Sequence, residues 1–415
     1  MSLKRFIVAT VGSLAALAIS SQALHAQDPT LFSPSEPASI FSGGAQYLVM
    51  SRDTKLSSNT KIVNGPDSQN IGFDSTDFHY ESGVRGFLAV ETDGIRLEAV
   101  YSNYGDWHEM HQGSFTQGLA FDDGITGPWL GANSLTASTY FSPLAAASTP
   151  ILGGEVNEFE GLGPNGGFPG DDFPAYRTWY NSRLRTVEVN LMTASPDSLF
   201  QYGIGYNNFQ LTEGAGTEIT GTFRAANGVG PNNGLSDASL TGVGGLTFLG
   251  GTPDGFQDEV GNISGFPDTL TMFREATTRN SLNGVQAIFQ QEIMYYRGIV
   301  VNGVFKAGLY HNSANGSIIE RYTGTDPSLG GPTSSYGRVI SDSRDVVAFA
   351  GTVGLQSSIP ISEHWSLIGG YEATIVHGVA LAPDQNLAAD GQTYDINANG
   401  DLIIHGANAG LQFKY

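Results

Sequence analysis

The chain ends on HGANAGLQFKY, residues 405–415, in which apolar and polar side chains alternate. The apolar face of this stretch consists of Ala409, Leu411, Phe413 and Tyr415. Alternation with a period of two is typical of a β-strand that has two different environments on its two faces. A chain terminus is ordinarily frayed unless a partner holds it. The sequence therefore predicts that residues 405–415 pair with another strand.

Alternating stretches of this kind recur along the chain and predict about ten strands. They lie near residues 45–52, 83–91, 95–103, 181–192, 199–211, 281–292, 297–311, 346–359, 364–377 and 401–415. The joins alternate strictly between short and long. Short turns occur at TDG, at ASPDS, around MYYR and at PISE. Long connections occupy about residues 53–82, 104–180, 212–280, 312–345 and 378–400.

This sorting of loop lengths is typical of a transmembrane barrel, which has short periplasmic turns, long outer loops and an even number of strands. A soluble sandwich has no reason to sort its loops in this way. The sequence thus predicts an all-β fold: a closed antiparallel transmembrane β-barrel of about ten strands, with large loops near 104–180 and 212–280.

The sheet is expected to close into a barrel because lipid surrounds it. Lipid offers no hydrogen bonds, so every backbone N–H and C=O in the apolar slab needs a partner within the protein. A sheet meets this requirement only when it has no free edge. We therefore expect 405–415 to pair with AQYLVMSR (45–52), with the odd-numbered residues of the terminus facing lipid. Tyr415 is then expected in the periplasmic aromatic girdle.

The first 26 residues have the layout of a secretory signal peptide. Lys4 and Arg5 precede an apolar run and a small-residue stretch, with cleavage after either Ala23 or Ala26. We expect residues 27–415 to form the exported barrel, located in the outer membrane. The chain has no cysteine, so neither disulfides nor thiolate metal sites stabilise it.

Composition excludes one class of partner. The formal net charge is -21, whereas nucleic-acid binding requires clustered Lys and Arg. The 55 glycines and the 11% aromatic content favour β structure over acidic disorder.

The terminal residues resemble the C-terminal assembly signal of bacterial outer-membrane barrels. A polar residue, a glycine two positions later and a closing aromatic pattern occupy Asn408, Gly410, Phe413 and Tyr415. This resemblance implies the barrel assembly machinery as a partner.

The chain also resembles the β-barrel porin family expanded in planctomycete-type bacteria. The resemblance rests on RLRTVEVNL, YGIGYNNFQLTE, TRNSLNGVQAIF, VNGVFKAGLYHN, HWSLIGGYEATIVHGVALAPDQ and HGANAGLQFKY, which cover strands of the C-terminal half. Family members tend to carry a Glu and tryptophans in the first strand, whereas this chain has only AQYLVM. The resemblance implies an outer-membrane location more than an activity.

The alternation of inward-facing and outward-facing residues along each strand predicts a set of charged side chains that face the lumen. They are Arg85, Glu91, Arg96, Glu98, Glu188, Lys306 and Glu372. Two interpretations remain open: the mixed charges neutralise one another in a packed interior, or they line a small aqueous path and set its ion preference. A bore of ten strands is narrow, and the two longest loops are candidates to fold inward and narrow it further.

Other motifs give weak signals. DWHEMH places His108 and His111 around Glu109, which is not the spacing of a zinc-binding helix. Acidic stretches at Asp122 and at Asp171–Asp172 follow no calcium-loop pattern, although divalent bridging to lipopolysaccharide is a hypothesis for them. No G-x-S-x-G nucleophile elbow is present. We expect no enzyme, no cofactor and no metal site.

The leading functional prediction is porin-like passage of small solutes or ions across the outer membrane. The alternative is a non-conducting barrel that displays acidic loops for adhesion or envelope structure. A third interpretation is a secreted, soluble β-protein that binds carbohydrate. The expected partners are outer-membrane lipid and lipopolysaccharide, the assembly machinery and small solutes or ions, without nucleic acid.

Overall fold

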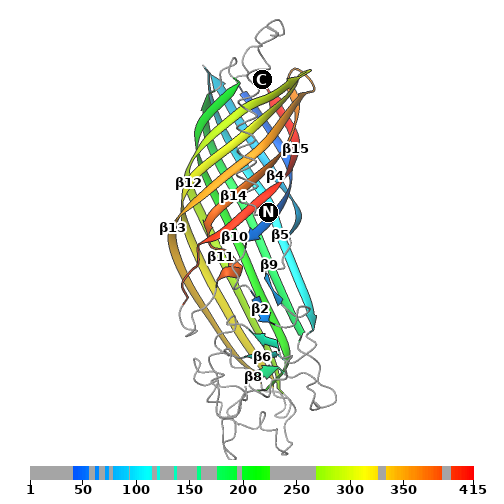
Figure 1. The fold of residues 1–415 in the computed structure, drawn as a ribbon, viewed down its shortest axis with the longest axis vertical. Coiled ribbons are helices and arrows are strands. Elements are labelled where there is room, and N and C mark those ends of the chain that lie inside the picture. The colour runs from blue at the N-terminus through cyan, green and yellow to red at the C-terminus, as the bar shows by residue number, and fades with distance from the viewer. Residues whose placement is uncertain are drawn as a thin grey trace, which may run out of the picture.

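The structure is a computed structural model and describes residues 41–55, 61–64, 71–73, 78–92, 94–114, 119–121, 135–137, 157–159, 175–193, 199–224, 268–325, 333–385 and 394–415. Ten long antiparallel strands close into a barrel (Figure 1). They are β1 (Phe41–Lys55), β4 (Phe78–Thr92), β5 (Ile95–Ser114), β9 (Ala175–Thr193), β10 (Phe200–Arg224), β11 (Asp268–Tyr296), β12 (Ile299–Thr325), β13 (Thr333–Pro360), β14 (Trp365–Val379) and β15 (Gly400–Lys414). Each strand pairs with its neighbour in this order, and β15 pairs with β1.

The seam between the last and first strands confirms the prediction made from the chain end. β1 and β15 are paired in register from Ser42 opposite Lys414 to Lys55 opposite Asp401. The ladder continues to the last residue, because the Phe41 and Tyr415 amides donate to each other's carbonyl oxygens at 3.1 and 2.9 Å. The barrel therefore has no free edge at this position.

Short connections join the expected strands. β11 and β12 meet at 297–298, and β13 and β14 at 361–364. β4 ends at Thr92 and β5 begins at Ile95, whereas β9 ends at Thr193 and β10 begins at Phe200. Asp93 and the predicted turn ASPDS, residues 194–198, lie outside the described residues. Arg297 and Gly298 both have positive φ, +49° and +84°. A two-residue turn with positive φ at both positions matches the twist of a hairpin.

The long strands extend further than the sequence predicted. β10 continues to Arg224 rather than 211, and β11 already begins at Asp268 rather than 281. β12 reaches Thr325 and β13 begins at Thr333, so the predicted boundaries at 311 and 346 were wrong by more than a dozen residues. The reason is that both faces of these extensions carry polar residues, which removes the alternation that marks a strand.

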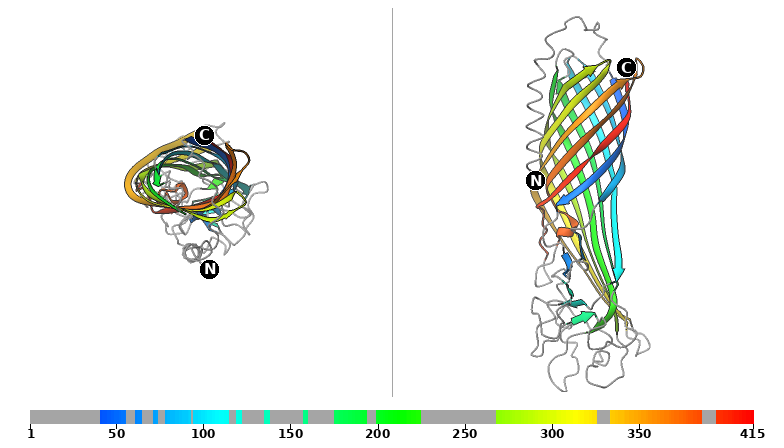
Figure 2. Two further views of the ribbon diagram at one scale, coloured as in Figure 1. Left: turned by 90° about the horizontal axis from the view of Figure 1, so that it is seen from above. Right: turned by 45° about the vertical axis from the view of Figure 1, so that its right-hand side comes forward.

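The barrel wall has a short side and a tall side. β1, β4, β14 and β15 have 15 residues each, whereas β11 has 29. The tall strands continue beyond the ends of the short ones, away from the turn end (Figure 2). A strand crosses a bilayer with about 9–11 residues, so most of the tall side lies outside the span that a bilayer would cover.

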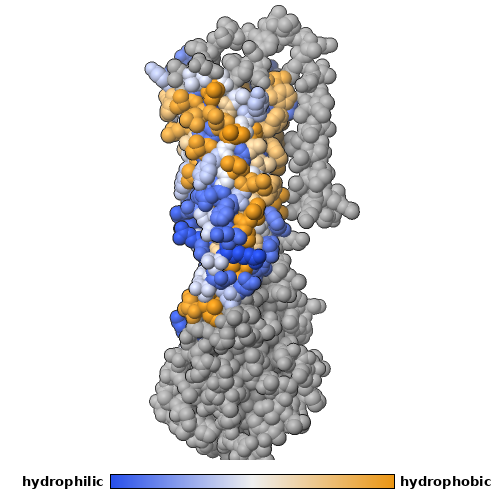
Figure 3. Space-filling view, turned by 90° about the vertical axis from the view of Figure 1, so that its left-hand side faces the viewer, coloured by the Kyte–Doolittle hydropathy of each residue, from blue (hydrophilic) through white to orange (hydrophobic). Residues whose placement is uncertain are grey.

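An apolar belt covers the outer surface near the turn end. Its exposed side chains include Tyr47, Val49, Leu88, Leu97, Val189, Ile204, Val285, Leu309, Phe349 and Leu367. Beyond this belt most outward-facing residues of the tall strands are polar, with exposed Val339 of β13 as an exception, and Figure 3 shows an apolar zone followed by a polar zone on one face of the barrel. Exposed aromatic residues gather at the turn end: Tyr202, Tyr295, Tyr296, Trp365 and Tyr415. This is the expected position of Tyr415.

The remaining elements are short. β2 (Lys61–Asn64) and β3 (Ile71–Gly72) follow β1, whereas β6 (Leu119–Phe121), β7 (Leu135–Ala137) and β8 (Asn157–Phe159) lie between β5 and β9. The 3-10 helix η7 (Ala382–Asp384) follows β14. Among the described residues, no helix is both long enough and apolar enough to cross a membrane.

The described part of the connection between β14 and β15 lies inside the barrel wall, at the end opposite the short turns, which we call the outer mouth. We call residues 379–385 and 394–399 the mouth segment. Ala380, Tyr394 and Ile396 are buried in one apolar cluster with Ala314 and Ile318 of β12. The segment requires glycine at position 316 of β12, because a Cβ there would lie 2.2 Å from the Tyr394 hydroxyl.

The two longest loops were predicted to be the candidates for folding inward. The central parts of these loops, 138–156 and 225–267, lie outside the described residues. The mouth segment belongs to the last connection, which is the shortest of the predicted long loops.

The belt makes a prediction that compares two outward positions on β13. Leu355 is 47% exposed within the belt, and Ser343 faces outward beyond it. We expect Leu355→Arg to lower the free energy of unfolding by about 2–4 kcal/mol, because lipid does not solvate a charge, and Ser343→Arg to lower it by at most about 1 kcal/mol. Urea unfolding in lipid vesicles measures both values. Equal losses would contradict this placement of the belt.

Candidate functional site

A polar cavity of about 300 Å³ lies inside the lumen. It extends from the turn end, where Gln201, Asn302 and Lys414 line it, to the level of Arg85 and Glu188. Every second residue of the surrounding strands points into it, which follows from the period-two geometry of a strand. Six of the seven predicted lumen-facing residues line this cavity: Arg85, Arg96, Glu98, Glu188, Lys306 and Glu372.

Arg85 and Glu372 form a bridge across the lumen from β4 to β14. Two guanidinium nitrogens of Arg85 donate to the two carboxylate oxygens of Glu372, and the Nη1–Oε2 distance is 2.8 Å. Arg85 Nε also donates to the Ser102 hydroxyl at 3.0 Å, and its second terminal nitrogen reaches Tyr104 at 3.3 Å. Bidentate pairing of this kind fixes the orientation of the arginine.

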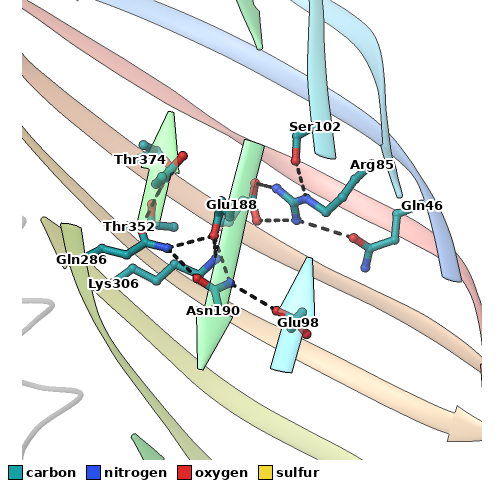
Figure 4. A network of polar contacts seen from close by, with 12 residues as sticks. Gln46, Arg85, Glu98, Ser102, Glu188, Asn190, Gln286, Lys306, Thr352 and Thr374 are labelled. Carbon is teal, nitrogen blue, oxygen red and sulfur yellow. Dashed lines mark hydrogen bonds and ion pairs between the residues drawn. The ribbon is translucent and has the colours of Figure 1, made fainter. Parts of the chain in front are cut away.

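A second bridge joins β12 to β9 (Figure 4). Lys306 Nζ donates to Glu188 Oε2 at 2.6 Å, and Gln286 Nε2 donates to the same oxygen at 3.0 Å. Asn190 accepts from Gln286 at 3.0 Å and donates to Glu98 at 3.4 Å. The carboxylate of Glu188 thus has several donors, as a buried charge requires.

The third pair is local. Arg96 donates to Glu98 at 2.6 Å on the same strand. Glu91 is half-buried and lies opposite Arg96 in the register of β4 and β5, but it does not line the cavity. The structure therefore brings six predicted residues together and leaves Glu91 beside them.

The charges of this cavity are mixed. Three of its four cations form ion pairs with its three anions, and Lys414 adds a fourth cation at the turn end, so the wall carries no ring of like charge. The six residues neutralise one another in three ion pairs, and the same residues line a polar cavity. An aqueous path that sets ion preference stays a prediction.

Side-chain hydrogen bonds from the barrel wall hold the mouth segment in place. Asn280 of β11 donates to the Ala380 carbonyl at 2.8 Å and accepts from the Ala380 amide at 2.7 Å. Asn312 of β12 donates to the carbonyl oxygen of Gly378, the residue before the segment, at 2.9 Å. The two asparagines imitate a neighbouring strand and satisfy the backbone of an unpaired segment.

Glu213 of β10 provides another anchor for the mouth segment. It accepts the Ala382 amide at 2.9 Å and the Tyr180 hydroxyl at 3.1 Å. Arg52 of β1 forms a fully buried ion pair with the same carboxylate. Because this charge is removed from water, its donors must replace the lost hydration.

Gln385 connects the two halves of the mouth segment. Its amide nitrogen donates to the carbonyl oxygens of Leu381 and Asn397, each at 2.8 Å. Its amide oxygen accepts the Tyr394 hydroxyl at 2.9 Å. Burial and the neighbouring Asp342 raise the pKa of Tyr394, so the hydroxyl keeps its proton and remains a donor at neutral pH.

The sequence analysis missed these mouth residues. Arg52, Glu213, Arg274 and Glu320 carry buried charges in the outer half of the barrel. These residues could have been found by continuing the alternation of inward-facing and outward-facing residues past the predicted end of each strand. On β10, for instance, the inward positions 203–211 lead directly to Glu213.

The residues of the predicted assembly signal lie at the seam. Asn408 faces the lumen and accepts a hydrogen bond from Gln46 at 3.2 Å, and Gly410 is opposite Gln46. Phe413 lies on the outer face between Trp365 and Tyr415, with ring centroids 5.4 and 6.4 Å away. This geometry describes the seam, and recognition by an assembly machinery stays a prediction.

The weak metal candidates do not converge in the described part of the chain. His108 contacts Asn181, and the His111 Nε2–Glu109 Oε1 distance is 3.6 Å. Within the described ranges, no group of three or more His, Asp or Glu side chains is placed to bind a metal ion. Asp122, Asp171 and Asp172 lie outside the described residues.

Comparison with known proteins gives similarity only to solved barrels. No family model matches this sequence, and no curated protein matches it. The outer-membrane protease OmpT from Escherichia coli is 10% identical with a TM-score of 0.36, over 93% of this chain and 100% of that chain. The toluene transporter TodX from P. putida is 8% identical with a TM-score of 0.25, over 91% and 90%.

The translocator domain of the autotransporter NalP from Neisseria meningitidis is 8% identical with a TM-score of 0.20, over 99% of this chain and 98% of that chain. These values transfer neither catalytic nor transport roles to this chain.

The lumen bridges make a prediction about stability. We expect Lys306→Met to lower the free energy of unfolding by about 2 kcal/mol, because it removes the partly buried cation from the buried carboxylate of Glu188. Glu188→Gln in the Lys306→Met background should recover at least half of that loss. A double-mutant cycle by urea unfolding measures the coupling. Additive losses in the double variant would show that the pair does not act as a unit.

Proposed function

We propose that this chain is an outer-membrane barrel that passes small polar solutes or ions, and that the mouth segment gates the passage. The polar cavity at the turn end carries this proposal, because amide and charged side chains surround it on the inside of a barrel whose outside is apolar. Water and small polar solutes are stable in such a cavity, whereas lipid is stable against the belt.

The outer-membrane location follows from the arrangement of the belt. A belt of apolar side chains about 25 Å tall, with aromatic residues at its border, matches a bilayer. The short turns then face the periplasm and the tall wall extends outward. The mouth segment closes the outer end of the passage, and its anchors are the polar side chains of Asn280, Asn312 and Glu213.

The mixed charge of the cavity gives the expected selectivity. Arg85, Arg96 and Lys306 are each paired with a carboxylate, and Lys414 adds a further cation at the turn end, so the wall has no ring of like charge. We propose weak ion selectivity, since strong selectivity comes from rings of like charge.

A non-conducting scaffold is the second candidate. The apolar cluster around Ala314, Ile318 and Tyr394 favours it, because this cluster leaves the outer mouth packed. The two candidates differ in a single property: whether the mouth segment leaves its site while the barrel stays folded.

Conductance in planar bilayers tests the gate. The double variant Asn280→Ala/Asn312→Ala removes the hydrogen bonds that hold Gly378 and Ala380. We expect its open probability to exceed that of the wild-type protein by on the order of tenfold, because unpaired backbone groups destabilise the closed state by about 1–3 kcal/mol.

Asn315→Ala is the matched control, because Asn315 lies on β12 with its side chain exposed. Its conductance should equal that of the wild-type protein. If heat-modifiable, folded protein gives no discrete current steps in either the wild-type or the double-variant form, the passage proposal fails and the scaffold stands.

A further inference from the structure

The apolar belt contains a groove on its outer surface. The groove has a volume of about 800 Å³ and crosses strands β5 and β9–β13. Ala287 and Ala307 face each other at its floor, and larger side chains, among them Ile204, Tyr206 and Leu309, stand around them. Small residues opposite one another leave a hollow in an otherwise convex wall.

The three strands β10, β11 and β12 change from apolar to polar outward-facing side chains at the outer end of this groove. The first polar side chains are Asn208 on β10, Asn283 on β11 and His311 on β12. Asn283 lies opposite both Asn208 and His311 in the paired strands. Asn283 accepts hydrogen bonds from the Tyr206 hydroxyl and from Asn208, both at 2.7 Å. Apolar side chains lie on one side of this row and polar side chains on the other, as expected where the acyl layer of a bilayer meets the headgroup layer.

Three arginines follow this border on the outward face. Arg185 of β9 lies opposite Gln210, while Arg183 of β9 and Arg279 of β11 both lie opposite Thr212 of β10. Neighbouring strands are about 4.8 Å apart, so Arg183 and Arg279 are about 10 Å apart at the backbone. The chain has 19 basic and 40 acidic residues, which makes a basic sector on its surface unusual.

Two of these arginines have no carboxylate partner in the described part of the chain. Arg183 pairs with Asp106, and the nearby His311 pairs with Asp345 at 3.7 Å. Arg279 is exposed and forms no ion pair with the described residues, nor does Arg185. The Nε of Arg185 is buried and has no hydrogen-bond partner among them.

We infer that this sector binds a phosphorylated acyl lipid of the outer leaflet. The acyl chains lie in the groove, and the phosphate lies on Arg185 and Arg279. Charge complementarity selects an anionic headgroup, and the position of the arginines directly beyond the belt selects a lipid rather than a soluble anion. Lipid A, the anchor of lipopolysaccharide, is the outer-leaflet lipid of this chemistry. The inference rests on the outer-membrane location in the proposed function.

Binding of purified diphosphoryl lipid A to the full-length protein in detergent, followed by native mass spectrometry, tests this inference. We expect Arg185→Gln/Arg279→Gln to weaken binding at least about tenfold, because each basic side chain at an anionic lipid surface strengthens binding about fivefold. Ala287→Trp fills the groove with an apolar side chain and should weaken binding severalfold without a change of charge.

Arg297→Gln is the matched charge control, because Arg297 lies in the turn at the opposite end of β11 and packs on Tyr296. It should bind lipid A like the wild-type protein. Dephosphorylated lipid A should bind weakly to all variants.

Unchanged binding in the double arginine variant would overturn the inference, as would equal binding of dephosphorylated lipid A. Phosphatidylglycerol that binds as tightly as lipid A would overturn the assignment to lipid A. Heat-modifiable migration verifies that each variant is folded. The binding assay is carried out in detergent and measures no current. A failure to bind lipid A therefore does not contradict the passage proposal. Likewise, a lack of conductance in planar bilayers does not contradict lipid A binding.

Discussion

Closure of the hydrogen-bond ladder between β1 and β15 is the constraint on which the rest of the structure depends. Within an apolar belt, a free edge would leave a row of backbone N–H and C=O groups without partners, and each would cost several kcal/mol. The ladder avoids this cost from Ser42–Lys414 to Lys55–Asp401, and it extends to the last residue of the chain. An apolar, ordered C-terminus follows directly.

Closure also separates two sets of side chains. Alternate residues point to the lumen or to the surroundings, so the same strands build a polar interior and an apolar exterior. The interior then contains charges that need partners, and the Arg85–Glu372 and Lys306–Glu188 bridges supply them across the lumen. Beyond the ends of the short strands, the inner face of the tall strands has no strands across from it. The mouth segment packs against the tall strands there. One rule of alternation thus gives the belt, the cavity and the need for a cover at the outer mouth.

The sequence predicted the features that depend on alternation and turn chemistry. The strand number, the seam and the inward direction of Arg85, Glu188 and Lys306 all follow from period-two patterns, and the turns at 297–298 and 361–364 lie where the sequence predicts them. It did not predict the outer halves of β10–β13, where both faces are polar and the pattern disappears. Nor did it predict the mouth segment, because its anchors, such as Asn280 and Glu213, come from strands distant in the chain. Contacts of that kind depend on tertiary packing, which no local pattern encodes.

The most direct test of the account is a disulfide across the seam, which is feasible because the chain has no cysteine of its own. Tyr47 and Ala409 are opposite each other in the β1–β15 register, and both face outward. The variant Tyr47→Cys/Ala409→Cys should form an intramolecular disulfide in the membrane-inserted protein and migrate as a closed loop on a denaturing gel. The offset pair Tyr47→Cys/Leu411→Cys should form it far less. No intramolecular disulfide in the first pair, or equal yields in both, would contradict a closed barrel in this register.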